Sequence, residues 1–205
     1  MITVAIVEDN DTIRNGLKHF LNETDNFKCV ADYSNCENLI DSLPAFRTDI
    51  VLMDINLPGI SGIEGIKEIK KIVPNQKIII LTVHAETENI FEALAAGAFG
   101  YLEKKTPPLQ MLTVIEDVYN HKSKMNTYIA RKINSFFTAY NKNWHKEELN
   151  KNEFMILKNL TEGHSPKALA DQFNVPTETI YEYFYQIYDK LHQQFEMMDQ
   201  SIIRY

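Results

Sequence analysis

The fold is decided by residues 50–62, which read IVLMDINLPGISG. The first four residues are apolar and predict a short buried strand, which the acidic Asp54 follows directly. Beyond this stretch, apolar residues recur at helical spacing over residues 63–73, and the pattern stops at Pro74. A buried strand followed by a helix is the repeating unit of a parallel sheet whose faces are covered by helices.

The same alternation of strand and helix signals extends through the first 121 residues. Short apolar runs lie at residues 2–7, 27–33, 50–53, 78–81 and 99–102. Helical spacing of apolar residues lies at 11–21, 36–43, 63–73, 90–96 and 109–119. Five strands, each followed by a helix, predict an α/β fold with a doubly wound parallel (βα)5 sheet. Functional groups of such sheets gather at the carboxyl ends of the strands.

Polar side chains stand at the ends of four of the predicted strands. They are Glu8 and Asp9 after the first strand, Asp54 after the third, Thr82 at the fourth and Lys104 after the fifth. Each carboxylate alone could be a helix cap or a solvated loop charge. Together, three carboxylates repel one another and attract a cation such as Mg²⁺, which prefers hard oxygen ligands. One carboxylate can then attack phosphorus to form an acyl phosphate, while the lysine offsets the charge of the transferred group.

Residues 1–121 resemble the receiver domain of two-component response regulators. Residues 53–62 (MDINLPGISG) resemble the family's phosphoacceptor loop, and residues 80–82 (ILT) and 100–104 (GYLEK) match its switch and lysine segments. The resemblance implies that a sensor histidine kinase phosphorylates Asp54. It also implies that the chain is not an enzyme in its own right, because the family catalyses only the transfer to, and loss from, its own aspartate.

The resemblance gives roles to the rest of the pocket. It implies a Mg²⁺ site formed by three carboxylates and one backbone carbonyl, those of Glu8, Asp9, Asp54 and Asn56. It implies that Thr82 is the switch hydroxyl, Lys104 the phosphate partner and Tyr101 the aromatic residue that changes rotamer. Two alternatives stay open: a receiver-like fold without phosphoryl transfer, and a Tyr101 that is simply a core residue on a central strand.

The charge of the chain is unevenly distributed. Residues 1–121 carry a net charge of −8, residues 122–148 one of +4 and residues 149–205 one of −3, which gives −7 for the whole chain. The basic middle part is predicted to be a linker with a connector helix over residues 128–140. Its basic side chains belong either to a solvated face or to a docking surface.

Several further features favour a cytoplasmic protein. No apolar run approaches the roughly 18–20 residues needed to span a bilayer, so no membrane association is expected. The N-terminus lacks the basic and apolar regions of a secretion signal. The two cysteines, Cys29 and Cys36, form no metal-ligand spacing and are too few for a disulfide scaffold, which suits a reducing compartment.

Residues 149–205 are predicted to form a small all-α helix-turn-helix domain. Three apolar stripes at helical spacing are separated by breaks at residues 163–165 and 175–177. The stretch resembles the LuxR-type effector domain of the NarL/FixJ group through a frame of residues: Leu149, Glu153, Ile156, Leu157, Leu160, Glu162, Gly163, Ser165, Lys167, Leu169, Ala170, Val175, Thr179, Ile180, Ile187, Lys190 and Leu191. The resemblance implies promoter DNA as a partner, control of transcription and a homodimer on activation. The tail, residues 192–205, is expected to form either a fourth helix or a frayed extension.

The predicted recognition helix departs from the family pattern. Relatives usually place lysine, histidine, asparagine and arginine on the face toward DNA, whereas this chain places there Glu178, Tyr181, Glu182, Tyr185, Gln186 and Lys190. Residues 176–191 have a net charge of −2, and DNA phosphates repel carboxylates. Two functions stay open: a phosphorylation-controlled transcription regulator that binds promoter DNA, and a phosphorylation-controlled switch whose helix-turn-helix binds a protein partner instead.

Overall fold

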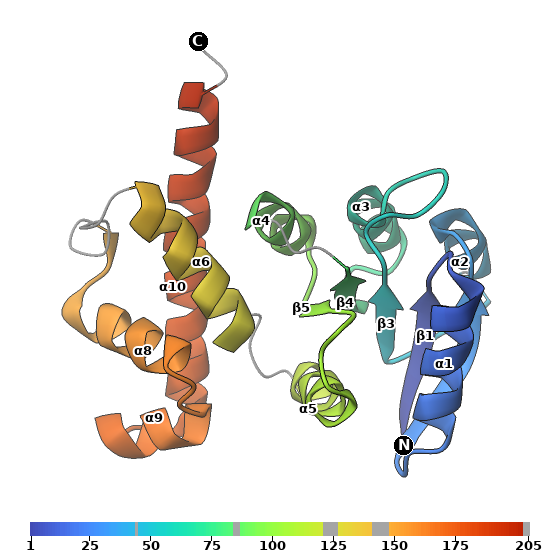
Figure 1. Cartoon of the computed structure of the whole chain (residues 1–205), viewed down its shortest axis with the longest axis horizontal. Helices are drawn as coiled ribbons and strands as arrows, with labels where there is room; N and C mark the ends of the chain where they lie inside the picture. The colour runs from blue at the N-terminus through green and yellow to red at the C-terminus, as the bar shows by residue number, and fades with distance from the viewer. Residues whose placement is uncertain (44, 84–86, 121–126, 141–147, 203–205) are drawn as a thin grey trace. The chain divides into compact units, whose positions relative to one another are not determined.

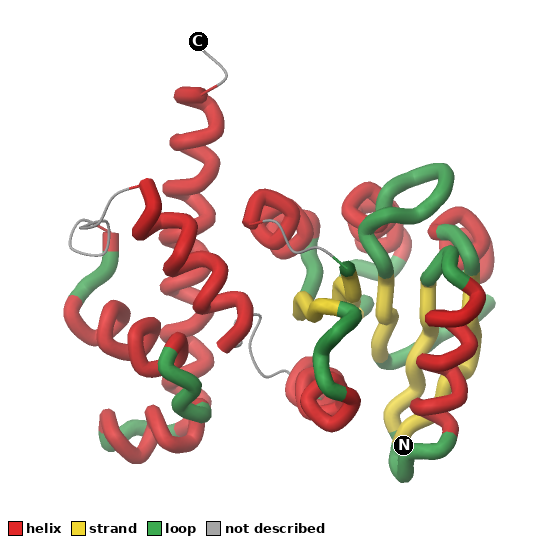
Figure 2. The backbone as a smooth tube through the Cα atoms, viewed as in Figure 1, coloured by secondary structure: helices red, strands yellow, loops and turns green. Residues whose placement is uncertain are grey.

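Two compact units make up the protein, Met1–Lys122 and Ser123–Tyr205 (Figure 1). The computed structural model describes residues 1–43, 45–83, 87–120, 127–140 and 148–202. The first unit combines strands with helices, and the described part of the second unit consists of helices and their connections (Figure 2). The predicted α/β fold followed by an all-α region is thereby confirmed.

The first unit is built on a five-stranded parallel sheet. Its strands are β1 (Ile2–Val7), β2 (Phe27–Tyr33), β3 (Ile50–Met53), β4 (Lys77–Thr82) and β5 (Gly100–Glu103). Their spatial order is β2-β1-β3-β4-β5, so the chain winds first in one direction from β1 and then in the other. This reversal places the carboxyl ends of β1 and β3 side by side, and open α/β sheets bind their ligands at such a position.

Helices cover both faces of this sheet. They are α1 (Asp11–Asn22), α2 (Cys36–Ser42), α3 (Gly62–Ile72), α4 (Thr87–Ala96) and α5 (Pro108–Tyr119). Helices α1 and α5 lie on one face, where Leu21, Met111 and Ile115 join the apolar core of the strands. Helices α2, α3 and α4 lie on the other face (Figure 1). Because both faces are covered, β3 is buried at every position, as its apolar run predicts.

Local signals fix where the helices begin at the carboxyl edge of the sheet. The Asn10 side chain accepts hydrogen bonds from two backbone N–H groups in the first turn of α1. Ser61 and Glu64 form a reciprocal capping box at the start of α3. Gly62 is required in between, because a Cβ at this position would overlap the carbonyl oxygen of Asp54. The chain can therefore turn sharply from β3 into α3 and leave Asp54 at the edge.

The second unit is a group of helices with its own apolar core. They are α6 (Thr127–Tyr140), α8 (Lys151–Thr161), α9 (Pro166–Phe173) and α10 (Thr177–Ile202). The core includes Ile133, Phe137, Ile156, Leu160, Leu169, Ile180, Phe184, Ile187 and Leu191. Asn174 caps the C-terminus of α9, and its left-handed φ of 53° turns the chain toward α10. Turns separate α8 from α9 and α9 from α10 where the sequence predicts breaks.

The helix predicted at residues 128–140 is observed as α6 and belongs to the second unit. Its Ile129, Ile133 and Phe137 side chains are buried, and the helix packs against α8. The Arg131 Nε donates a hydrogen bond of 2.6 Å to the carbonyl oxygen of Thr161 at the end of α8. Arg131 therefore has a structural role within the unit, which neither of the two predicted alternatives included.

The C-terminal tail differs from both predictions made for it. Residues 192–202 neither fray nor form a separate fourth helix but continue α10, which is 26 residues long. No glycine or proline interrupts the sequence from Leu191 to Ile202, so a helix nucleated upstream can propagate. Residues 203–205 lie outside the described part of the chain. Despite the length of α10, neither it nor any other described helix is apolar enough to cross a membrane.

Candidate functional site

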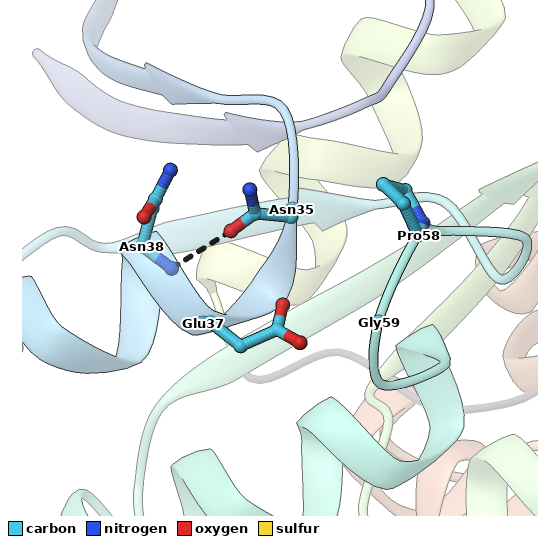
Figure 3. A pocket seen from close by; sticks show the side chains of 5 residues that line it. All are labelled: Asn35, Glu37, Asn38, Pro58 and Gly59. Atoms are coloured by element: carbon cyan, nitrogen blue, oxygen red, sulfur yellow. Dashed lines mark hydrogen bonds between the residues drawn. The ribbon is translucent and has the colours of Figure 1, made fainter.

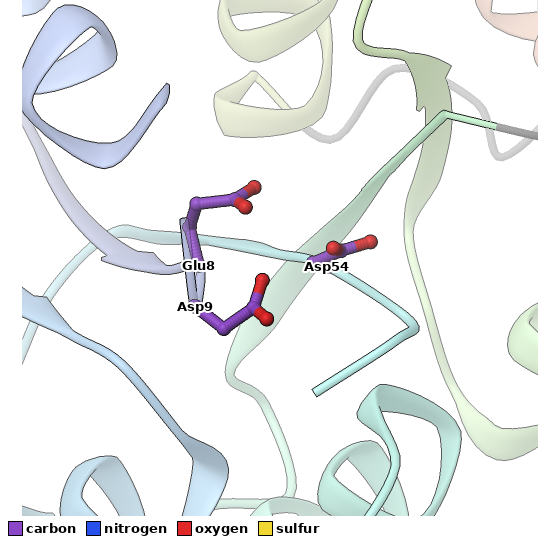
Figure 4. Close-up of side chains that lie close together, drawn as sticks. All are labelled: Glu8, Asp9 and Asp54. Carbon is purple, nitrogen blue, oxygen red and sulfur yellow. The ribbon is translucent and has the colours of Figure 1, made fainter. Parts of the chain in front are cut away.

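Three carboxylates meet at the carboxyl edge of the sheet. Glu8 and Asp9 follow β1, and Asp54 follows β3, where its N–H donates a 2.9 Å hydrogen bond to the carbonyl oxygen of Val7. One carboxylate oxygen from each of the three acidic residues lies within 4.8 Å of the other two (Figure 4). Glu8 and Asp54 are buried while Asp9 is exposed, so solvent reaches the cluster beside Asp9.

Lys104 places a cation between two of these carboxylates. Its Nζ lies 2.6 Å from Glu8 Oε2 and 2.7 Å from Asp54 Oδ2, and its side chain is only 11% exposed. Burial alone would lower the pKa of this ammonium, but the hydrogen bonds and charges of Asp54 and Glu8 raise the pKa above its usual value. Lys104 is therefore charged at neutral pH and offsets part of the repulsion among the carboxylates.

Both oxygens of the Asp54 carboxylate have a fixed direction. Oδ1 accepts a hydrogen bond of 2.7 Å from the N–H of Ile55, and Oδ2 accepts one from Lys104. The residue is 5% exposed. A carboxylate held in this way would lose little further freedom if a reactant approached it.

Glu8 is subject to opposing influences. Burial raises the pKa of its carboxyl group, and the hydrogen bonds from Lys104 and from the N–H of Asn10 partly counteract this rise. The net effect is a raised pKa. A divalent cation beside Glu8 would favour its ionised form, because it adds positive charge where burial has removed water.

The donor set fits Mg²⁺. The three carboxylates offer hard oxygen atoms close together, and Asn56, which is exposed, lies two residues beyond Asp54 in the loop between β3 and α3. Mg²⁺ binds few protein ligands and keeps several waters, and the exposure of Asp9 leaves room for them. The residues that the sequence predicts for a metal site are therefore compatible with it in type, spacing and access.

The predicted switch residues lie on two neighbouring strands. Thr82 is the last residue of β4 and Tyr101 the second of β5, and both are fully buried. The register pairs Ile80 with Tyr101 and Thr82 with Glu103. The N–H of Lys104 donates a 2.7 Å hydrogen bond to the carbonyl oxygen of Thr82, so the ends of these strands are tied together beside Asp54. Burial of Tyr101 is expected for either interpretation of this residue.

Arg14 braces the acidic loop after β1, a role that the sequence analysis missed. Its Nη1 donates a 2.7 Å hydrogen bond to the carbonyl oxygen of Glu8. The guanidinium also pairs with Asp11 and, at 3.4 Å, with Asp32. The sequence offers one signal for this role, because Arg14 lies in the first turns of the helix that follows the acidic pair Glu8 and Asp9. Its preference for a backbone carbonyl depends on geometry that residue spacing does not reveal.

The predicted recognition residues all lie on α10, but their charges are not equally available. Lys190 Nζ bonds both carboxylate oxygens of Glu153, each at 2.8 Å, and the Glu153 side chain is 3% exposed. Glu178, Glu182, Gln186 and Asp189 are exposed and follow one another at spacings of four, four and three residues, on one face of the helix. Tyr181 and Tyr185 are half-buried beside this face. The single lysine of residues 176–191 is therefore engaged within the unit.

Known proteins match both units of the chain. Residues 4–116 match the family model described as response regulator receiver domain. Response regulator UvrY of Escherichia coli K12 is 31% identical over 196 residues, which cover 93% of this chain and 88% of UvrY. The crystal structure of a two-component response regulator of the LuxR family from Aurantimonas sp. SI85-9A1 matches with a TM-score of 0.64 and 26% identity over 67% of this chain and 99% of that one. The RcsB response regulator of Salmonella typhimurium shares the fold, with a TM-score of 0.60 and 22% identity over 93% of this chain and 91% of RcsB.

These matches agree with the carboxylates and the lysine gathered at the sheet edge. The family model covers more than half of the chain, and the match to UvrY extends through the helical second unit. The chain therefore belongs to the two-component response regulators of the NarL/FixJ group, which join a receiver domain to a LuxR-type helix-turn-helix domain and control transcription.

Proposed function

We propose that this response regulator is switched by phosphorylation of Asp54, with a sensor histidine kinase as the donor. The observation that carries the proposal is the buried Asp54 carboxylate, which lies beside Glu8, Asp9 and the Lys104 ammonium at the reversal point of the sheet. Burying carboxylates close together destabilises a protein unless a cation offsets their charge, and such clusters are typical of functional sites. We place residues 1–121 in the receiver and residues 149–205 in the effector domain. The connector helix of the predicted linker, residues 122–148, folds with the effector domain, because α6 packs against α8.

The reaction is a phosphoryl transfer to a carboxylate. An oxygen of Asp54 attacks the phosphorus of a phosphohistidine, so a P–O bond forms, the P–N bond breaks and the imidazole leaves. Glu8, Asp9, Asp54 and the Asn56 carbonyl would hold Mg²⁺, which supplies positive charge to the phosphoryl oxygens when bound. Lys104 can pair with the phosphoryl group by exchanging one carboxylate partner for it. Water later hydrolyses the acyl phosphate, so the only chemistry is that of Asp54 itself.

The signal would pass from Asp54 to the rest of the receiver through Thr82 and Tyr101. The Thr82 hydroxyl would donate a hydrogen bond to the phosphoryl group, and Tyr101 would change rotamer to follow it. Phosphorylation then stabilises one of two receiver conformations and so shifts their populations. We expect the activated form to be a homodimer in the cytoplasm, where the kinase domain and promoter DNA are accessible.

A second candidate output is binding of a protein partner by the helix-turn-helix instead of promoter DNA. The salt bridge between Lys190 and Glu153 is consistent with it, because it engages the single lysine of residues 176–191 on the predicted recognition face of α10, although the Lys190 side chain stays 43% exposed. The remaining exposed charges on that face, Glu178, Glu182 and Asp189, would repel DNA phosphates.

Phosphorylation can be tested with phosphoramidate, a small donor that also contains a P–N bond. Full-length protein is incubated with the donor and Mg²⁺, and the intact mass is measured. We expect one added phosphoryl group on the wild type and on Asp25→Asn, a control at an exposed carboxylate, and none on Asp54→Asn or in the presence of a chelator. Equal phosphorylation of Asp54→Asn would refute the proposed acceptor.

The output can be tested by DNA binding across a series of salt concentrations. The protein is used with and without beryllofluoride, a stable phosphoryl mimic, and Mg²⁺. Tight binding of a promoter fragment that weakens steeply with salt would favour the transcription regulator that binds DNA. Absence of binding in both states would favour the protein partner and leave the receiver as the switch.

A further inference from the structure

Glu37, which is not part of the loop between β3 and α3, forms a hydrogen bond to the backbone of that loop. Glu37 is the second residue of α2, and its Oε1 accepts a hydrogen bond of 3.0 Å from the backbone N–H of Ile60. Figure 3 shows its side chain reaching from the start of α2 toward the part of the loop that carries Pro58 and Gly59. The contact joins two elements that are separate in the sequence.

Glycine at position 59 leaves the space that the Glu37 carboxylate occupies. A Cβ on Gly59 would overlap Glu37 Oε1, and the backbone there has a φ of +80°, which glycine adopts at little cost. The second carboxylate oxygen, Oε2, is buried without a hydrogen-bond partner among the described residues. Glu37 is therefore committed to the loop through a single hydrogen bond, and its fit depends on Gly59.

Backbone hydrogen bonds close the base of the same loop. The N–H groups of Gly62 and Leu57 donate to the carbonyl oxygen of Ile55 at 2.8 and 3.1 Å. Asn56 lies within this turn, two residues beyond Asp54. The loop is thus fixed at its base by its own backbone and nearer its tip by Glu37.

We propose that Glu37 is a positioning residue for the Mg²⁺ site, acting through the loop that carries Asn56. The proposal rests on the proposed function, in which the Asn56 carbonyl is a Mg²⁺ ligand. The two backbone bonds at the base flank Asn56 and share one acceptor, the Ile55 carbonyl. We expect that without the bond to Ile60 the loop samples conformations in which the Asn56 carbonyl turns away from the carboxylates. Loss of groups that orient metal ligands costs roughly 10–100-fold in metal affinity, and one bond to a loop belongs at the lower end of that range.

The test uses full-length variants that separate the hydrogen bond of Glu37 from its negative charge. Glu37→Ala removes both the hydrogen bond and the charge, whereas Glu37→Gln removes the charge but keeps an oxygen that can accept from Ile60. Glu68→Gln neutralises an exposed carboxylate of α3 and serves as the control. Mg²⁺ affinity is measured by calorimetry, and hydrogen exchange of the Ile60 amide is measured without metal. We expect Glu37→Ala to raise the Mg²⁺ Kd about tenfold and to speed Ile60 exchange, while Glu37→Gln stays within about twofold of the wild type.

Each outcome decides the role of Glu37. Equal weakening in Glu37→Ala and Glu37→Gln would overturn positioning in favour of a simple charge effect, and an unchanged Glu37→Ala would overturn it outright. If Glu37→Ala does not fold, Glu37→Asp replaces it, because it keeps the charge but shortens the reach, and it is then expected to raise the Kd. A wild type that binds no Mg²⁺ would overturn the proposed metal site together with this role. A wild type that binds Mg²⁺ beside an unaffected Glu37→Ala would overturn the role of Glu37 alone.

Discussion

The two units use their charged side chains in opposite ways. In the receiver, Lys104 and three carboxylates converge at one edge of the sheet, and two of these groups, Glu8 and Asp54, are buried. In the C-terminal unit, Lys190 of α10 pairs with the buried Glu153, and the carboxylates of Glu178, Glu182 and Asp189 on the same helix are exposed. The charged groups of the receiver therefore lie where a ligand can bind them. In the C-terminal unit, the Lys190–Glu153 pair instead joins α10 to α8.

This difference shows that a residue type at a family position does not establish that its charge is available. Lys190 belongs to the frame that resembles LuxR-type domains, yet Glu153, from the same frame, occupies its ammonium with both oxygens. Glu153 also accepts a hydrogen bond of 2.8 Å from the N–H of Asn150 and so closes the capping box of α8. Function in this unit must therefore be argued from exposed groups, whereas in the receiver it is argued from buried ones.

The largest effect is expected on the rate of phosphorylation when Lys104 is replaced. It tests whether the charged groups of the receiver act as a specific site. Lys104→Met leaves the buried Glu8 and Asp54 without their shared cation and removes the proposed partner of the incoming phosphoryl group. We expect the rate of phosphorylation by phosphoramidate to fall about 100-fold, as is typical when one group that stabilises transition-state charge is lost. Mg²⁺ affinity, measured by calorimetry, should not fall, because a competing cation has been removed.

Lys105→Met is the matched control for this prediction. Lys105 is adjacent in sequence, but its side chain is 80% exposed and pairs with Glu103. Surface ion pairs contribute little, so we expect a change of less than about twofold. Equal slowing by both substitutions would mean that the receiver responds to overall charge and contains no specific lysine site.

A smaller effect is expected from reversing charge on the exposed face of α10. The triple variant Glu178→Lys, Glu182→Lys and Asp189→Lys replaces three repulsive groups with three that can contact phosphates. If this face approaches DNA, affinity at low salt should rise at least about tenfold. The plot of log affinity against log salt should steepen by roughly two to three, since each phosphate contact contributes about −0.9.

The matched control places the same charge change on the other unit. Glu23, Glu92 and Glu116 are exposed on the receiver, and their replacement by lysine gives the same net charge. A rise in affinity of equal size in both triple variants would show a general charge effect. No rise in either would mean that α10 does not face DNA, and a protein partner would then be the better explanation.

The receiver could be predicted well from its sequence because its signals are local and repeat. The apolar run before Asp54 identifies a buried strand, and parallel topology alone brings strand ends together, so the carboxylates and Lys104 could be grouped without coordinates. The direction of individual side chains could not be predicted in this way. The bond of Arg14 to the Glu8 carbonyl and that of Glu37 to Ile60 depend on backbone geometry in loops.

The C-terminal unit was harder to predict because its decisive contacts join distant parts of the sequence. Glu153 and Lys190 are 37 residues apart, and their contact depends on how α8 packs against α10. The frame that resembles LuxR-type domains ends at Leu191, so it predicts nothing about the tail, although no residue there stops a helix and α10 continues to Ile202. The sequence pattern predicts three helices separated by two turns, whereas the length of α10 depends on helix propagation and the pairing of Glu153 with Lys190 depends on packing.

The smallest effect is expected from releasing Lys190 from Glu153. This change tests directly whether the lysine of α10 serves the fold or is available to DNA. Glu153→Gln keeps an oxygen for the capping box but removes the charge that holds the lysine. We expect a loss of about 1 kcal/mol in the stability of this unit, a modest value because the Lys190 side chain is 43% exposed and screened by solvent. The freed ammonium should add about one phosphate contact and steepen the salt dependence of DNA binding by about one.

The stability is measured by denaturant unfolding followed by circular dichroism. Glu162→Gln is the control, because it weakens an exposed pair with Lys158 at 3.9 Å. Lost stability with an unchanged salt dependence would mean that Lys190 serves the fold alone, and unchanged stability would mean that its pairing with Glu153 does not hold the helices together.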